Sequence, residues 1–364
     1  MSELNEKPIL KLSPFADYVI ECDLCLFGSP DKPLKLSSLI NKIVLNFCEE
    51  SGTVRNTSEK VKEEELASYF SRMGIELSRS HLIRFRNTST ISQKKYAYPP
   101  DAVEKRIILN DKALDILRIY TEDESYKTLQ EIYSRGGSFS SALFVSALVE
   151  EYAKLPMYRR EAIYYADTMK TVEEAIRANN DGDTKYLIID TKKASRITMY
   201  PVEILLDEWS TYNYIIGIGE FDPAKGEVPI SVKLSNIQKI SIVKSGNILI
   251  RHDLKMINEL YERVKSRGVM FIGSHKTEGE IIKVRLTEKG FNLYNSMTFL
   301  RPKYDSEETD QNGDHILTFS CTCQQILYYF QRIGKYAEIL EPPKLRKKFA
   351  ALYSAANELY RDKD

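Results

Sequence analysis

The residues of this chain that could do chemistry are cations and aromatic rings set close together. The richest stretch is LSRSHLIRFRNTSTISQKKYAYPP, residues 77–100, which contains no acidic residue. Its cations are Arg79, Arg84, Arg86, Lys94 and Lys95, and its interleaved rings are Phe85, Tyr96 and Tyr98. Because cations contact phosphates and rings stack on bases, this composition predicts binding of single-stranded nucleic acid. A solvated basic connector, or a β-hairpin that packs its own rings, fits the same residues.

A second group of such residues lies between positions 192 and 233. It combines the cations Lys192, Lys193, Arg196 and Lys233 with the rings of Tyr200, Tyr212 and Tyr214. These side chains are a second candidate site for phosphates and bases. Since side chains alternate along a strand, Tyr212 and Tyr214 share one face of YNYIIGI. That face can also be the interior, where the rings would fill the core.

The elements that must position the second group are five short strands within residues 185–243. The apolar, β-branched runs are KYLIID, RITMYPVEILL, YNYIIGIGE, VPISVKL and IQKISIV, with turn residues between them. The turns include Asp222-Pro223-Ala224-Lys225-Gly226 and Ser235-Asn236. Five strands this short have two edges to hide. The pattern therefore predicts a closed or nearly closed SH3-like or Sm-like barrel.

This stretch resembles the WYL domain. In that family a Trp-Tyr-Leu strand is followed by a strand that ends in Leu-Asp-Arg-Ile, and the corresponding residues here are Asn213-Tyr214-Ile215 and Leu234-Ser235-Asn236-Ile237. Asn236 thus stands where the family has an arginine. The resemblance implies a barrel with a polar pocket for nucleic acid or a nucleotide-like ligand, which Tyr214, Lys233 and Arg196 could line.

Residues 280–360 resemble the C-terminal extension that often follows WYL domains. The more specific match is Glu341-Pro342-Pro343-x-Leu345-Arg346, after a predicted helix that ends at Gly334. The last helix, from Lys344 to Tyr360, has an apolar stripe typical of a core or of a dimer interface. Another amphipathic helix, DLKMINELYERVKSR, links barrel and extension. The predicted domains are residues 1–165, 166–250 and 251–364, and we expect the last to mediate dimerisation.

The N-terminal region gives the order strand, helix, helix twice. Residues 15–73 contain a predicted strand, YVIECDLCLF, a helix that starts near Leu36, and the acidic helix SEKVKEEELASYFSRM. Residues 103–155 contain a predicted strand, KRIILN, and the helices DKALDILRIY, TLQEIYS and SFSSALFVSALVEEYAKL. This order resembles a ribbon-helix-helix protein. A generic helical domain fits the sequence about equally well.

Composition limits the function classes. The chain has 364 residues, 43% of them hydrophobic, and its 52 cationic and 52 acidic side chains balance, so any nucleic-acid binding must come from local patches. We expect a cytoplasmic protein without membrane contact, because there is no long apolar run and no signal peptide, and the five cysteines are sparse. Cys22 and Cys25 lack a second ligand pair, so we expect no metal and no cofactor.

An enzyme is the competing class. The sequence contains no HExxH, P-loop, dinucleotide-binding fingerprint or nucleophile elbow. The four histidines lie far apart, with no obvious carboxylate partners. A catalytic set assembled only by the fold is the alternative that such motifs do not test. We nevertheless expect a non-enzymatic protein.

The sequence therefore predicts an α+β protein: a ribbon-helix-helix-like region, a WYL barrel and an α/β extension. It resembles the WYL-domain accessory proteins of type VI-D CRISPR systems. That resemblance implies a homodimer that binds single-stranded RNA and enhances an RNA-guided CRISPR ribonuclease. The alternative is a WYL-type transcription regulator that binds duplex DNA through a ribbon-helix-helix and senses a nucleotide-like ligand. The absence of a winged helix-turn-helix favours the first hypothesis.

Overall fold

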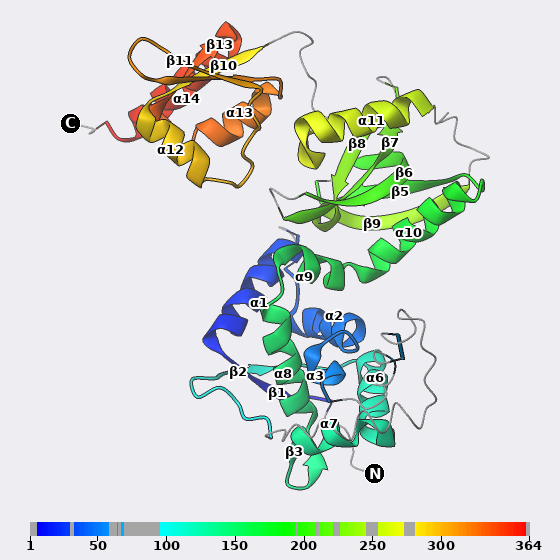
Figure 1. Cartoon of the computed structure of the whole chain (residues 1–364). Helices are drawn as coiled ribbons and strands as arrows, with labels where there is room; N and C mark the ends of the chain where they lie inside the picture. The colour runs from blue at the N-terminus through cyan, green and yellow to red at the C-terminus, as the bar shows by residue number, and fades with distance from the viewer. Residues whose placement is uncertain are drawn as a thin grey trace. The chain divides into compact units, whose positions relative to one another are not determined.

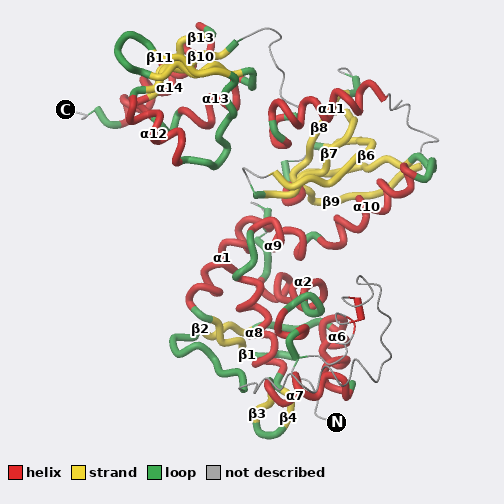
Figure 2. Tube along the Cα trace, in the orientation of Figure 1, coloured by secondary structure: helices red, strands yellow, loops and turns green. Residues whose placement is uncertain are grey.

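The chain forms two compact units, Met1–Ala166 and Asp167–Asp364. The computed structural model describes residues 6–29, 33–57, 64, 67–68, 95–193, 195–207, 211–220, 226–244, 254–272 and 281–361. Helices and small antiparallel sheets occur together in this part of the chain (Figures 1 and 2), which confirms the α+β class. No helix in the described ranges is both long and apolar enough to cross a bilayer.

The first unit places helices around a two-stranded ribbon. Its elements are β1 Ile9–Leu12, α1 Pro14–Phe27, α2 Leu36–Phe47, α3 Gly52–Arg55, β2 Val103–Arg106, α6 Asp111–Glu122, the 3₁₀ helix η1 Glu124–Tyr126, α7 Lys127–Ile132, β3 Ser134–Arg135, β4 Ser138–Phe139, α8 Ser141–Ala153 and α9 Met157–Tyr164. β1 and β2 pair antiparallel, with Ile9 opposite Arg106 and Leu12 opposite Val103. The ribbon thus joins segments that lie far apart in the sequence.

Helix α1 corrects the sequence prediction, which made residues 18–27 a strand. Pro14 occupies the first turn, and the side chain of Ser13 accepts a hydrogen bond from the Ala16 amide, as an N-cap does. The buried residues of α1, Ala16, Val19, Ile20, Asp23 and Phe27, follow helical spacing. The β-branched run YVIEC suggested a strand. The N-cap at Ser13 and the helical spacing of the buried residues instead favour a helix.

Helix α8 is the centre of the first unit. Ten of its residues are buried, and a helix that is apolar on all sides belongs in a core. The carboxylate of Glu150 accepts hydrogen bonds from the Ser13 amide at 2.6 Å and the Ser13 hydroxyl at 2.8 Å, which ties the N-terminus of α1 to α8. The helices predicted over 111–120, 128–134 and 138–155 are confirmed as α6, α7 and α8. The predicted acidic helix of residues 58–73 lies outside the described residues, apart from 64, 67 and 68.

The second unit begins with helix α10, Ala166–Asn180, and a five-stranded antiparallel sheet. The strands are β5 Lys185–Thr191, β6 Arg196–Asp207, β7 Tyr212–Glu220, β8 Val228–Lys233 and β9 Ile237–Lys244, with the 3₁₀ helix η3 Leu234–Asn236 before β9. All five lie where the sequence predicted strands. The spatial order is β8-β7-β6-β5-β9.

The two edge strands of this sheet are consecutive in the chain. Five flat strands would place β8 and β9 about 19 Å apart, whereas the three residues of η3 advance only about 6 Å. The sheet must therefore be strongly curved. The predicted closed barrel is not present among the described residues, because no ladder joins β8 to β9.

Gly217 sits where β6 and β7 come closest. It pairs with Pro201, next to a bulge in the ladder. A Cβ at Gly217 would lie 2.1 Å from the Tyr200 carbonyl oxygen. Only glycine allows the curvature at this point.

One face of the sheet is covered by helix α11, Leu254–Arg267, followed by the 3₁₀ helix η5 Val269–Phe271 (Figure 1). Leu260 of α11 and Ile272 are fully buried against Tyr214, Ile216 and Ile218 of β7. The stripe predicted for this helix is confirmed at Leu260, while Leu254 is 77% exposed. The predicted N-cap Asp253 lies outside the described residues.

The C-terminal extension is a split βαβ unit with its own core. Its elements are β10 Ile282–Leu286, α12 Glu288–Ser296, β11 Ser306–Thr309, β12 His315–Phe319, α13 Cys323–Phe330, the 3₁₀ helix η6 Gly334–Tyr336, β13 Ala337–Glu341 and α14 Pro343–Leu359. The antiparallel sheet has the order β11-β12-β10-β13. Strand, helix, strand, strand, helix, strand with this order is the ferredoxin-like topology.

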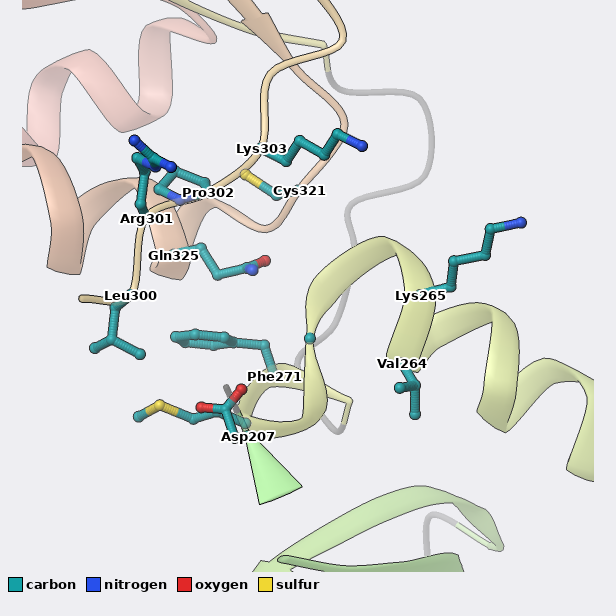
Figure 3. A pocket seen from close by; sticks show the side chains of 12 residues that line it. Asp207, Val264, Lys265, Phe271, Leu300, Arg301, Pro302, Lys303, Cys321 and Gln325 are labelled. Atoms are coloured by element: carbon teal, nitrogen blue, oxygen red, sulfur yellow. The ribbon is translucent and has the colours of Figure 1, made fainter. Parts of the chain in front are cut away.

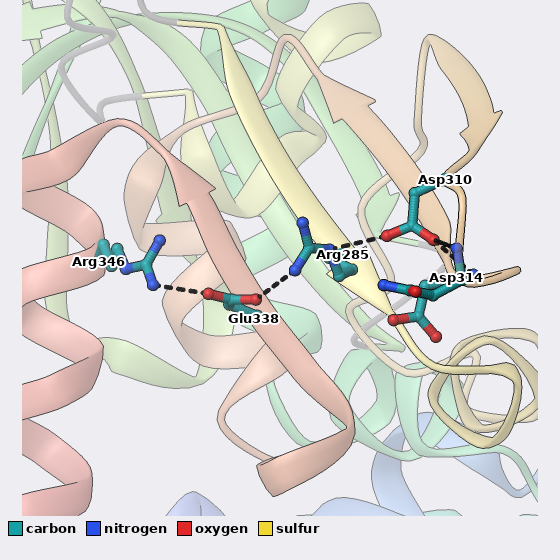
Figure 4. A network of polar contacts seen from close by, with 6 residues as sticks. Arg285, Asp310, Asp314, Glu338 and Arg346 are labelled. Carbon is teal, nitrogen blue, oxygen red and sulfur yellow. Dashed lines mark hydrogen bonds and ion pairs between the residues drawn. The ribbon is translucent and has the colours of Figure 1, made fainter.

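The outer face of this small sheet carries a network of ion pairs (Figure 4). Arg285 lies 3.2 Å from the Asp310 carboxylate and 3.1 Å from that of Glu338, and Arg346 of α14 donates to Glu338 at 2.6 Å. Domains of this topology that bind RNA on the sheet present aromatic rings on the central strands. Here carboxylates surround Arg285 instead, so this face is unsuited to nucleic acid.

His315 gives the extension a pH-dependent contact. Its ring nitrogens lie 3.1 Å from Glu288 and 2.7 Å from Glu307, and its ring stacks on Phe291 at 3.9 Å. The hydrogen bond to Glu288 raises the pKa of His315 above its ordinary value of 6.5. The pKa of His315 is therefore higher in the folded protein than in the unfolded chain. The stabilisation by its ion pairs is complete below pH 6.5 and is lost as the pH rises through the pKa of the folded state.

We therefore expect the melting temperature of the wild type to exceed that of His315→Gln at about pH 6, and the difference to shrink towards about pH 9. Thermal denaturation across this range measures it. Glu288→Gln should reproduce part of this loss of melting temperature, because it removes one of the two carboxylates that contact His315. A difference that grows with pH would contradict the assignment.

Candidate nucleic-acid interface

Four described cations of the sheet lie at or beside the turn between β5 and β6. Lys192 and Lys193 lie in this turn, Arg196 begins β6, and Lys239 lies on the neighbouring strand β9. Asp190 is opposite both Arg196 and Lys239 in the sheet register. We call these four cations the basic turn. They form a local positive patch in a chain whose total charge is zero.

Within the basic turn, Arg196 is held by Asp190. Its Nε donates to Oδ1 at 2.7 Å and its Nη2 to Oδ2 at 3.3 Å. The same contact lowers the pKa of Asp190 below its ordinary value. Arg196 is 71% exposed at its side chain, so the pair is screened by water and an incoming phosphate can compete for the guanidinium.

The predicted aromatic members of this site are mostly core residues. Tyr214 is 5% exposed and packs under α11, and Tyr200 is 9% exposed and makes an edge contact with Tyr186 at 5.9 Å. Tyr212 shares the face of Tyr214 and is partly buried, with Lys233 Nζ 3.0 Å from its ring centroid. These rings point into the core, which is the alternative that the sequence left open. Tyr200 and Tyr214 therefore expose no ring face on which a base could stack.

The connector of residues 77–100 is described only at its end. Arg79, Arg84, Arg86 and Lys94 lie outside the described residues. Lys95 is exposed, and the Tyr96 amide donates to the Ile132 carbonyl at 3.2 Å. The Tyr96 ring packs on Tyr133 at 5.6 Å, and burial raises the pKa of its hydroxyl. At least this ring belongs to the packing of the first unit.

A basic and aromatic segment that the sequence analysis missed lies in the extension. Residues 297–304, MTFLRPKY, contain two cations and no acid, the same composition that singled out residues 77–100. Phe299 is 48% exposed, and Arg332 donates to its carbonyl at 2.8 Å. The Arg301 guanidinium donates to the Asn295 carbonyl at 3.0 Å and lies 5.5 Å from the Tyr294 ring.

This segment forms one wall of a pocket of about 180 Å³ (Figure 3). The other walls come from the end of α11, from η5 and from α13. Its lining residues are Asp207, Val264, Lys265, Gly268, Met270, Phe271, Leu300, Arg301, Pro302, Lys303, Cys321 and Gln325. Three cations, one carboxylate and one amide surround an apolar floor. Such a surface suits an anionic ligand that carries a ring.

Metal ligands do not gather at any of these places. In the ranges that the structure describes, no three His, Cys, Asp or Glu side chains are arranged to hold an ion.

The fold defines an α+β protein that joins a ribbon and helix unit to a curved five-stranded sheet and a ferredoxin-like unit. No family model matches the sequence, and no curated protein matches it either. Among solved structures, the crystal structure of a CRISPR Cas-related protein aligns over 99% of this chain and 95% of its own, with a TM-score of 0.68 and 20% identity. This likeness establishes a shared fold along the whole chain. The proteasome accessory factor PafBC of Arthrobacter aurescens aligns over 94% of this chain and 54% of its own, with a TM-score of 0.26 and 14% identity.

Proposed function

We propose that this protein is a non-enzymatic accessory factor that binds single-stranded RNA and enhances an RNA-guided CRISPR ribonuclease. The observation that carries the proposal is the end-to-end fold likeness to a CRISPR Cas-related protein. The curved sheet with consecutive edge strands supports the WYL-like part of this assignment, since η3 turns at the Leu234-Ser235-Asn236 motif. Adding the protein to an RNA-guided CRISPR ribonuclease, and measuring the rate of RNA cleavage with and without it, tests enhancement directly.

The cations of the basic turn support binding to a single strand. They lie on a curved sheet and not on an element shaped to enter a groove of duplex DNA. The basic turn offers three exposed cations, Lys193, Arg196 and Lys239, and an unpaired strand is flexible enough to follow such a patch. Filter binding with RNA, single-stranded DNA and duplex DNA of matched sequence should give the tightest binding for single-stranded RNA. Tighter binding to the duplex would contradict the proposal.

The basic turn and the connector can be separated by mutation. Lys193→Ala with Arg196→Ala should weaken RNA binding by about 1–3 kcal/mol and lower its salt dependence by up to about two phosphate contacts. Both side chains are exposed, so the fold should persist. If this variant binds like the wild type while Arg84→Ala with Arg86→Ala does not, the RNA site belongs to the connector.

Duplex DNA binding is the second candidate function, and the ribbon favours it. β1 and β2 pair antiparallel and each is followed by helices, as in proteins that insert a ribbon into the major groove. However, Lys11 on this ribbon is held by Glu104 at 2.9 Å. A carboxylate on the reading face opposes a phosphate-rich partner, so we rank this function second.

Helix α14 is the surface on which we propose homodimerisation. Residues 350–361 are all exposed, yet Leu352, Tyr353, Leu359 and Tyr360 lie at helical spacing on one side. An apolar stripe that continues past the core of its own domain is typical of a helix that packs on a second copy.

Sedimentation equilibrium should therefore give twice the chain mass of 42.0 kDa. Leu352→Arg should shift the protein to the monomer, because a charge would be buried in the interface. Ser354→Arg adds the same charge on the opposite side of α14 and should leave the dimer intact. A wild-type monomer at micromolar concentration would refute the proposal.

A further inference from the structure

We propose that the pocket of Figure 3 binds one nucleotide of the RNA, with a guanine base inside and its phosphate at Lys265 and Lys303. The inference deepens the proposed function and rests on it for the identity of the polymer. It assigns the site to residues of β6, α11, η5, the segment 297–304 and α13, and neither the WYL resemblance nor the sequence analysis had selected these residues.

The size and floor of the pocket fit a single ring. Its volume of about 180 Å³ is below the ~300–1,000 Å³ of pockets that enclose a drug-sized ligand. Val264, Met270, Phe271 and Leu300 give the ring apolar contacts. A base can therefore enter while the sugar and phosphate stay at the mouth.

The polar groups favour a base that donates two hydrogen bonds and accepts one. Asp207 is 4% exposed and Gln325 is 8% exposed, and both line the pocket. The carboxylate of Asp207 accepts hydrogen bonds and repels phosphate. The Gln325 Oε1 already accepts from the Thr322 amide at 2.9 Å and the Thr322 hydroxyl at 3.1 Å, so its amide nitrogen is the donor end. Guanine offers N1–H and N2–H₂ beside the acceptor O6, which complements this pair.

The cations lie where the phosphate would emerge. Figure 3 shows the Lys265 and Lys303 side chains extending to the same side, away from Asp207. Their long stems let both ammonium groups reach one phosphate. We assign no phosphate contact to Arg301, because its guanidinium is engaged by the Asn295 carbonyl and the Tyr294 ring.

The backbone supplies an independent sign of function. Leu300 has a φ of 57°, a left-handed conformation that is unfavourable for a branched side chain. Its side chain lines the pocket. Strained residues cluster at ligand sites, where the surrounding structure fixes them for binding. Leu300 holds its side chain against the pocket at this cost.

Calorimetric titration of the full-length protein with GMP, AMP, UMP and ribose 5-phosphate tests the proposal. GMP should bind about tenfold or more tightly than the other three. Lys265→Glu with Lys303→Glu should lower GMP affinity about tenfold or more and reduce its salt dependence. The matched control, Lys289→Glu with Lys335→Glu, changes two lysines outside the pocket that lie near Tyr336 and should bind like the wild type.

Asp207→Asn should abolish the preference for GMP over AMP. If that variant does not fold, the lysine pair still decides, since Lys265 and Lys303 are both exposed and their replacement should leave the fold intact. Equal affinity for GMP and ribose 5-phosphate, or an unchanged affinity in the lysine variant, would overturn the inference. If the lysine variant binds RNA as strongly as the wild type, the pocket is not part of the RNA site, and the proposed function stands. If the protein binds GMP but no RNA, the pocket binds a nucleotide, and the proposed function is wrong.

Discussion

Replacement of Arg160 by methionine should lower the free energy of unfolding by about 3–5 kcal/mol, because it leaves a buried carboxylate without its cation. Asp23 is fully buried on α1. Arg160 donates to it from Nε at 2.8 Å and from Nη2 at 3.2 Å, and the Tyr152 hydroxyl donates at 2.8 Å. The three residues come from α1, α8 and α9, so this network fastens the helices of the first unit.

Chemical denaturation measures the loss, and the neighbouring residue provides the control. Arg159 pairs with Glu50 at 2.8 Å, but its side chain is 46% exposed. Arg159→Met should therefore cost only about 0–1 kcal/mol. A further change, Asp23→Leu in the Arg160→Met background, should recover part of the stability, because an apolar pair replaces the uncompensated charge. If Arg159→Met and Arg160→Met lower the free energy of unfolding by similar amounts, the burial of Asp23 is not the cause of the loss at Arg160.

The strands of the second unit could be predicted because local signals agree there. Each run is short, β-branched and bounded by turn residues, and tertiary packing does not override it. The first unit shows the opposite case. The strand β1 has only four residues, ILKL, and its partner β2 lies about ninety residues later, so pairing is not visible locally. For α1 the decisive signal was present at Ser13-Pro14, but the β-branched run after it carries the stronger local propensity for a strand.

The sequence predicted which residue types gather at the candidate site, but it did not predict which way their side chains point. Alternation correctly places Tyr212 and Tyr214 on one face, but the period of two residues does not say which face is covered. That depends on α11, which returns from residues 254–267 to bury Tyr214. The pocket needed two segments, η5 and residues 297–304, to meet in space, and no spacing in the sequence reports such a meeting. The basic and aromatic composition of MTFLRPKY was the one signal available.

Tyr214→Ala separates a structural role from a binding role at an aromatic residue of the predicted site. Tyr214 is 5% exposed and packs with Ile216, Leu260 and Ile272. Removing a buried ring of this size should cost about 3–5 kcal/mol of stability through lost burial and the cavity left behind. RNA affinity, measured well below the melting transition, should stay unchanged because the ring has no face exposed to a base.

Tyr212→Ala is the matched comparison on the same face of β7. Its ring is only partly buried and lies under Lys233 Nζ at 3.0 Å, a contact worth about 0.5–1 kcal/mol at an accessible site. The loss of stability should therefore be clearly smaller than at Tyr214, and any effect on RNA should appear here, because Lys233 would be released from the ring. If Tyr214→Ala instead remains stably folded and loses RNA binding, Tyr214 must leave the core to contact bases, and α11 must move away from the sheet when RNA binds.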